Sequence, residues 1–167
     1  MKIITWNVNG IRSRIFNEQI SSKLKKNELI CPQESSPIKK LIDDYSPDVI
    51  CIQETRCGLE NAKKISIPGY KSLFNESKMD GARAADRYSG TAVFYRENMN
   101  VLEISTTFPG YEDPEGRVIT ITFESFTCIT VYAPNSGTNF DNKIYFMEAM
   151  IDYLNNINGP VVFCGDL

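Results

Sequence analysis

The sequence of 167 residues contains no histidine. Within this chain, that absence excludes Ser-His-Asp and Cys-His catalysis, histidine metal ligands and an imidazole general base. Any chemistry that the chain itself supplies must therefore come from carboxylate, amide, phenol, Lys, Arg or Cys side chains. The five cysteines are odd in number and none forms a Cys-x-x-Cys pair, so a zinc site is not expected either.

Long apolar runs are absent as well. The apolar stretch at the N-terminus is too short for a signal peptide, and no segment approaches the length of a membrane span. Cys51, Cys128 and Cys164 lie inside short apolar runs, which is typical of buried thiols. These features predict an intracellular protein, in the cytoplasm or nucleus, with no membrane partner.

The sequence also lacks an overall excess of basic residues. Eighteen basic and 21 acidic side chains give a net charge of −3. The charge is nevertheless uneven, because residues 1–40 have eight basic and three acidic side chains, whereas residues 97–167 have a net charge of −8. Local basic segments of this kind are compatible with phosphate binding at one face, and the alternative is an ordinary solvated surface.

The remaining sequence has the composition of a globular domain, with 42% apolar and 23% charged residues. Apolar, β-branched runs predict strands at residues 2–8, 48–54, 70–74, 91–96, 101–107, 117–124, 127–132 and 161–165, of which 117–124 and 127–132 would form a hairpin. Helices are predicted at 38–45 and 139–157, and residues 11–30 have apolar side chains at roughly helical spacing. The mixture predicts an α/β fold with a mixed sheet.

The helix predicted at residues 139–157 has the clearest pattern. It has one apolar stripe, which consists of Phe140, Ile144, Met147, Ile151 and Leu154. A strong stop signal follows it at residues 158–160 (NGP).

Several predicted strands end in residues that could bind a metal ion or a phosphate. These residues are Asn7 and Asn9, Glu54, Tyr132 with Asn135 after it, and Asp166. Ligands gather at strand ends because the loops there can vary while the strands hold position. Carboxylate and amide oxygens without clustered histidine or thiolate suit Mg²⁺ or Mn²⁺, with Glu54 as the principal ligand. For each residue alone, an ordinary turn or an exposed polar side chain is the alternative.

Six short motifs follow one another along the chain, at residues 5–12 (TWNVNGIR), 52–57 (IQETRC), 88–93 (YSGTAV), 113–119 (DPEGRVI), 131–137 (VYAPNSG) and 164–167 (CGDL). In this order they closely resemble the motifs of the exonuclease III family of apurinic/apyrimidinic (AP) endonucleases, within the endonuclease/exonuclease/phosphatase superfamily. The resemblance implies a four-layer α/β sandwich, in which two mixed β-sheets are flanked by helices.

The resemblance also implies that residues 1–167 are an incomplete domain. They would hold roughly the first half to two-thirds of the fold, without a C-terminal part that contributes an Asp-His pair and is needed for a complete site. Residues 15–46 are longer than the usual segment between the first two motifs, so we expect an insertion there.

On the metal side of the site, the resemblance implies that Glu54 holds Mg²⁺, with Mn²⁺ as a substitute. Asn7 and Asn9 would lie in the same metal shell. Arg56 stands where the family commonly has Lys, and it would support the ligand cluster beside the substrate.

On the substrate side, the resemblance implies that Tyr132 and Asn135 contact the scissile phosphate. Asp166 would orient or deprotonate the attacking water. The residues expected to bind the DNA backbone or phosphate are Arg12, Arg117 and, through their amides, Ser136 and Gly137. For Arg117 the alternative is a solvent-facing position in the hairpin.

The function implied is Mg²⁺-dependent cleavage of double-stranded DNA 5′ to abasic sites in base-excision repair, with 3′–5′ exonuclease activity as an accompanying property. The alternatives are another phosphoesterase of the superfamily, or a non-catalytic DNA-binding fragment. We expect the chain by itself to be largely inactive. We also expect it to aggregate or dimerise, since an apolar sheet face and strand edges would be left uncovered.

Overall fold

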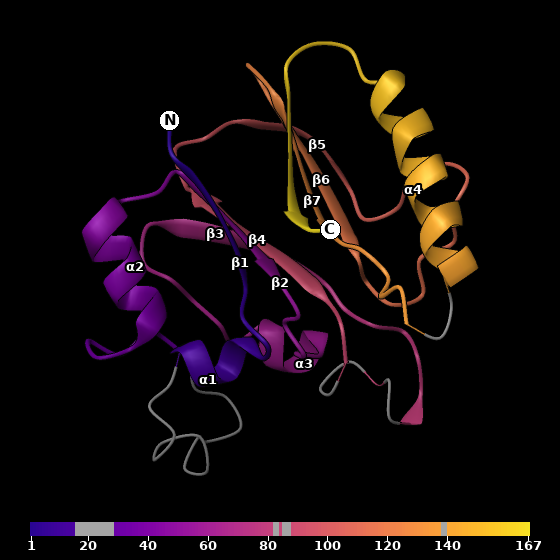
Figure 1. Cartoon of the computed structure of the whole chain (residues 1–167). Helices are drawn as coiled ribbons and strands as arrows, with labels where there is room; N and C mark the ends of the chain where they lie inside the picture. Colours follow the sequence, from indigo (N-terminus) through magenta and orange to yellow (C-terminus); the bar gives the residue numbers. More distant parts are fainter. Residues whose placement is uncertain (16–28, 82–83, 85–87, 138–139) are drawn as a thin grey trace.

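The computed structural model describes residues 1–15, 29–81, 84, 88–137 and 140–167. Two four-stranded sheets pack face to face, and helices cover the outer face of each sheet (Figure 1). The expected four-layer α/β arrangement with two mixed sheets is therefore confirmed.

The first sheet has the strand order β1 (Ile3–Asn7), β2 (Val49–Gln53), β4 (Thr91–Arg96) and β3 (Tyr70–Asn75). β1 and β2 are parallel, and the other two pairs are antiparallel. All five residues of β2 are buried, because the strand lies inside the sheet and both of its faces are covered. This burial explains why its sequence, VICIQ, is almost continuously apolar.

The second sheet has the strand order β5 (Val101–Ser105), β6 (Val118–Phe123), β7 (Thr127–Tyr132) and β8 (Val161–Asp166). β6 and β7 form the predicted hairpin, which turns between Phe123 and Thr127. β8 is added to β7 in parallel. The eight predicted strands are thus all present, with ends that differ from the prediction by at most two residues.

Helices α1 (Ile11–Ile15), α2 (Pro37–Tyr45) and α3 (Leu59–Ala62) lie beside the first sheet. α2 begins where the sequence provides a cap, since Ser36 Oγ accepts the N–H of Lys39 and Pro37 occupies the first turn. α3 was not predicted, because four residues are too few to show a helical period. Of the helical pattern in 11–30, only α1 is a described helix, and residues 16–28 of the expected insertion lie outside the described residues.

α4 (Phe140–Asn155) covers the second sheet, but with a different face from the one predicted. Phe146, Ala149 and Met150 are its buried residues. Phe140, Ile144 and Ile151 of the predicted stripe are 57%, 42% and 54% exposed. The helix has apolar residues around most of its circumference, so the sequence pattern does not select the packing face.

The apolar core has three parts, one between the sheets and one under each helical layer. The part between the sheets includes Val49, Val93, Ile119 and Ile121. No helix within the described ranges is long and apolar enough to cross a membrane.

Candidate active site

The carboxyl ends of four strands meet at one edge of the sandwich. β1 and β2 are parallel in one sheet, β7 and β8 are parallel in the other, and β1 contacts β8. Each strand delivers one polar side chain at or just after its end: Asn7, Glu54, Tyr132 and Asp166. Four residues that are far apart in the sequence therefore come together where sheet proteins commonly bind ligands.

The side-chain amide of Asn7 lies between two carboxylates that come from different sheets. Its Nδ2 donates to Glu54 Oε1 at 2.9 Å and to Asp166 Oδ2 at 2.6 Å. Its Oδ1 accepts the backbone N–H of Asn9 at 3.1 Å, and this bond fixes the orientation of the amide. Asn7 therefore presents its N–H groups, and not its oxygen, to the carboxylates. In this arrangement Asn7 positions the two carboxylates, and its predicted role as a metal ligand stays a prediction.

Glu54 is a partly buried carboxylate with several donors. Arg56 Nη2 lies 2.6 Å from Glu54 Oε2, and the Tyr132 hydroxyl is a further hydrogen-bond partner. Burial raises the pKa of Glu54, but the hydrogen bonds from Asn7, Tyr132 and Arg56 outweigh burial, so the net pKa lies below its usual value. Glu54 is therefore ionised at neutral pH and available to a cation.

Tyr132 is only 7% exposed, and its phenol faces this carboxylate. Burial and the negative charge of Glu54 raise the pKa of Tyr132 to about 12. The phenol is therefore neutral at physiological pH and can act as a hydrogen-bond donor. The same position would suit donation to a phosphate oxygen.

Backbone hydrogen bonds join the loops that carry four of the motifs. The N–H of Gly10 donates to Glu54 O at 2.8 Å, and the N–H of Thr55 donates to Gly90 O at 3.0 Å. Gly90 N–H in turn donates to Glu115 O at 3.2 Å. The motifs thus form one continuous backbone network around the end of β2.

Left-handed backbone conformations are concentrated in these loops. Asn9, Glu54, Arg56 and Ser89 have φ values of 47°, 52°, 45° and 51°. Such conformations in residues other than glycine cost about 1–3 kcal/mol each and persist only where the surroundings fix them. Their position around Glu54 is typical of a site where the direction of a side chain matters more than local stability.

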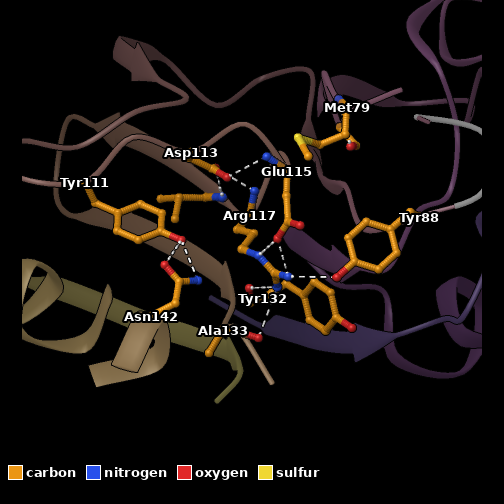
Figure 2. A network of polar contacts seen from close by, with 11 residues as sticks. Met79, Tyr88, Tyr111, Asp113, Glu115, Arg117, Tyr132, Ala133 and Asn142 are labelled. Carbon is orange, nitrogen blue, oxygen red and sulfur yellow. Dashed lines mark hydrogen bonds and ion pairs between the residues drawn. The ribbon is translucent and has the colours of Figure 1, made fainter. Parts of the chain in front are cut away.

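Arg117 is 2% exposed and uses all five of its N–H groups inside the protein (Figure 2). Nε and Nη2 contact Glu115 Oε2 at 2.7 and 2.6 Å, and Nη1 donates to the carbonyls of Tyr132 and Ala133 at 2.9 and 3.1 Å. Nη2 also donates to Tyr88 Oη at 3.3 Å. As placed, Arg117 has no donor left for a phosphate and does not face solvent, so neither sequence interpretation of this residue fits its position.

The role of Arg117 is instead to hold Tyr132. Its guanidinium carbon lies 4.8 Å from the centre of the Tyr132 ring, in cation–π geometry, while Nη1 binds the Tyr132 carbonyl. Asp113 supports the turn before Arg117, because its carboxylate accepts the backbone N–H groups of Glu115, Arg117 and Val118 at 3.1, 2.6 and 3.3 Å (Figure 2). This supporting group was not predicted from the sequence. The signal that could have revealed it is the pair of acidic residues, Asp113 and Glu115, just before the apolar strand β6.

The other predicted site residues lie on the surface. Asn135, Ser136 and Gly137 lie in the loop after β7 and are exposed, as are Asn9 and Arg12. Exposure leaves these residues accessible to a bound molecule, and their individual roles stay predictions.

Comparison with known proteins identifies related sequences and folds. Residues 4–167 match the Endonuclease/Exonuclease/phosphatase family. The chain belongs to this family. Its fold is similar to that of a 3′-5′ exonuclease from Neisseria meningitidis, with a TM-score of 0.70 and 22% identity over all of this chain and 57% of that one.

Two curated relatives of this Endonuclease/Exonuclease/phosphatase family member have similar sequences along its whole length. A DNA-(apurinic or apyrimidinic site) endonuclease of Dictyostelium discoideum is 30% identical, and the match covers 41% of that protein. An exodeoxyribonuclease of Bacillus subtilis is 32% identical, and the match covers 58% of it. The chain therefore spans about half the length of the curated relatives it matches.

The donor set of this family member fits a hard divalent cation. Glu54 and Asp166 supply carboxylate oxygens on either side of one amide, and Mg²⁺ is usually held by one or two carboxylates with water and phosphate as the remaining ligands. Glu54 is therefore the carboxylate that could hold such an ion, and Asp166 lies on the other side of the amide. The arrangement could support hydrolysis of a phosphoester, in which a cation and a neutral phenol face the phosphate and a second carboxylate faces the attacking water.

Proposed function

We propose that the protein of which this chain is part is a Mg²⁺-dependent DNA repair nuclease, which cleaves the backbone 5′ to abasic sites in an intracellular compartment. The observation that supports this most strongly is the joining of Glu54 and Asp166 through Asn7, beside the phenol of Tyr132. The similarity to a protein named DNA-(apurinic or apyrimidinic site) endonuclease supports the choice of substrate.

Glu54 would hold the Mg²⁺ ion, and when bound the ion would supply Lewis-acid stabilisation of negative charge on the phosphate. Asn7 keeps the two carboxylates at a fixed separation, since each accepts one of its N–H groups. Arg56 balances part of the negative charge of Glu54 at 2.6 Å. The ligand set is thus organised before the substrate arrives.

Tyr132 would donate its phenolic hydrogen to a non-bridging oxygen of the phosphate. Asn135 and the amides of Ser136 and Gly137 would donate from the loop that follows β7. Asp166, which is exposed at the end of β8, would orient the attacking water and accept its proton. Arg12 would contact the DNA backbone from α1.

A 3′–5′ exonuclease activity is the second candidate. It is supported by the similarity to an exodeoxyribonuclease and to the fold of a 3′-5′ exonuclease. Both activities would hydrolyse a DNA phosphodiester with the same groups. They would differ only in whether the surface around the site accepts an internal abasic site or a 3′ end.

The test incubates the complete protein, of which this chain is part, with each of three compounds in Mg²⁺. These are a labelled duplex with one tetrahydrofuran abasic analogue, a matched undamaged duplex and an inositol polyphosphate. We expect cleavage 5′ to the analogue. Asp166→Asn should abolish this cleavage, and Asp152→Asn, at an exposed position of α4, should retain it. Release of phosphate from the inositol compound without cleavage of DNA would instead identify another phosphoesterase.

We further propose that the 167-residue chain by itself turns over slowly, because the family resemblance places an Asp-His pair of the complete site in a later segment. For this chain, anisotropy with the same two duplexes in Ca²⁺ provides the readout. Tighter binding of the abasic duplex supports the proposed substrate, and equal or undetectable binding of both duplexes contradicts it. Fast Mg²⁺-dependent nicking by the chain alone would contradict the proposed slow turnover.

A further inference from the structure

Three thiols form a cluster between the two sheets, apart from the carboxylate site. Cys51 on β2, Cys128 on β7 and Cys164 on β8 have their Sγ atoms all within 4.8 Å of one another. The Sγ atoms of Cys51 and Cys128 are 3.7 Å apart, and both side chains are buried in the core between the sheets. Cys164 is partly buried beside them.

Polar side chains from neighbouring strands surround the Cys164 sulfur outside the three-thiol cluster. The hydroxyls of Thr5 and Thr130 lie next to the Cys164 sulfur. Gln53 Nε2 donates to both hydroxyls, at 3.0 and 2.8 Å, and so fixes their positions. Outer hydrogen bonds that orient ligand atoms are a common feature of metal sites.

The size of the cluster fits one ion bound by three sulfurs. For a metal–sulfur bond of about 2.3 Å, three sulfurs around one ion lie about 4 Å apart. The Sγ atoms of Cys51 and Cys128, at 3.7 Å, are already close to this separation. The other two Sγ–Sγ distances are at most 4.8 Å, so binding an ion would require the sulfur atoms to move by less than about 1 Å.

The donor set selects the kind of ion. Soft thiolate ligands favour Cu(I), zinc and iron–sulfur clusters over Mg²⁺ or Ca²⁺. Structural zinc sites have four ligands, whereas the cluster found among the described residues has three members and the chain has no histidine that could complete it. Thiolate-bound iron–sulfur clusters similarly need four cysteines. Three-coordinate Cu(I) needs no fourth ligand, so it is the ion that the three sulfurs fit best.

We propose that Cys51, Cys128 and Cys164 form a binding site for one soft monovalent cation of the Cu(I) class, which would link β2, β7 and β8 across the interface between the sheets. Copper enters and remains as Cu(I), and each S–H that is replaced by a Cu–S bond releases one proton to solvent. No oxidant or reductant takes part in the binding.

The test is a competition titration of the 167-residue chain against the Cu(I) chelator bicinchoninate, without oxygen and in the Cys31→Ser background, which removes an exposed thiol. We expect one Cu(I) per chain, a rise in Tm on binding, and three sulfur neighbours in X-ray absorption at the copper edge. Cys128→Val, which keeps an apolar side chain of similar size, should weaken binding roughly 100-fold.

Cys57→Val is the matched control, because Cys57 is also buried but lies outside the cluster. It should retain the affinity for Cu(I). Circular dichroism checks that both variants fold. If Cys128→Val does not fold, the number of sulfur neighbours in the X-ray absorption spectrum of the parent chain tests the proposal instead. Two sulfur neighbours, equal affinity in Cys128→Val, no binding, or loss of two thiols to a disulfide without copper uptake would each overturn the proposal.

Discussion

Asn7 Nδ2 donates a hydrogen bond of 2.6 Å to Asp166 Oδ2, although the two residues are 159 positions apart in the sequence. The bond joins the end of the first strand of one sheet to the end of the last strand of the other. The same nitrogen lies 2.9 Å from Glu54 Oε1, so one neutral amide separates two carboxylates. A third negative charge at this position should therefore be unfavourable unless a cation is present.

Replacing Asn7 with Asp tests this relationship. The variant loses both donated hydrogen bonds and adds a like charge, so its free energy of unfolding without divalent ions should fall by roughly 1–3 kcal/mol. Mg²⁺ should restore part of the loss. Urea denaturation with and without Mg²⁺ measures both effects, and Asn98→Asp, on an exposed turn, is the control for the charge change. Equal stability of the two variants would contradict the bridging role of Asn7.

Arg117 should be far more important for stability than for contact with a substrate. In Arg117→Met the buried carboxylate of Glu115 loses its ion pair with Arg117, so unfolding should become easier by about 3–5 kcal/mol. Adding Glu115→Gln to that variant removes the negative charge that Arg117 balances in the parent chain and should recover part of the loss. Denaturant titration of the two single variants and the double variant gives the coupling free energy, and a value near zero would exclude a structural ion pair.

The raised pKa of Tyr132 predicts that the free energy of unfolding falls at high pH. Because its pKa in the folded protein is raised to about 12 from 10.0, its contribution is complete below pH 10 and disappears as the pH rises toward 12. A shift of this size corresponds to about 2–3 kcal/mol. Tyr132→Phe should therefore lose less stability between pH 9 and 12 than the parent chain, while Tyr145→Phe, on the exposed side of α4, should follow the parent. Identical profiles for all three would show that Tyr132 titrates normally.

Gly165 allows β8 to bring Asp166 to the site. A Cβ atom there would lie 2.0 Å from Val131 O, and the residue has a φ of 147°. Gly165→Ala should therefore push β8 away from β7, displace Asp166 and lower Tm. Gly137→Ala has open space around its Cβ and should leave Tm unchanged. Calorimetric unfolding of both variants provides the comparison, and equal Tm values would contradict the close approach of β8 to β7.

The strands and the four meeting residues could be predicted from the sequence, because short β-branched runs and polar strand ends are local features. That Asn7, Glu54, Tyr132 and Asp166 lie together also follows from the parallel pairing at the two sheet edges. Their hydrogen-bond directions could not be predicted. Whether Asn7 turns its oxygen or its nitrogen toward Glu54 depends on the backbone N–H of Asn9, which only the folded loop places.

Two features depended on long-range packing and were therefore not accessible from local patterns. Arg117 has the sequence context of a hairpin residue, but the carbonyls of Tyr132 and Ala133 and the Glu115 carboxylate surround its guanidinium in the fold. Cys51 and Cys128 were correctly predicted to be buried, but their proximity to each other depends on how the two sheets face each other.

Binding of Mn²⁺ as a spectroscopic substitute for Mg²⁺ tests the central claim most directly, namely that Glu54 is the principal ligand of a single cation site beside Asp166. Electron paramagnetic resonance titration of the chain should show one Mn²⁺ bound per molecule. Glu54→Gln should weaken this binding by roughly 100-fold, or about 2.7 kcal/mol, and Asp152→Asn should leave it unchanged. An affinity for Mn²⁺ that is the same in Glu54→Gln as in the parent chain would contradict the account.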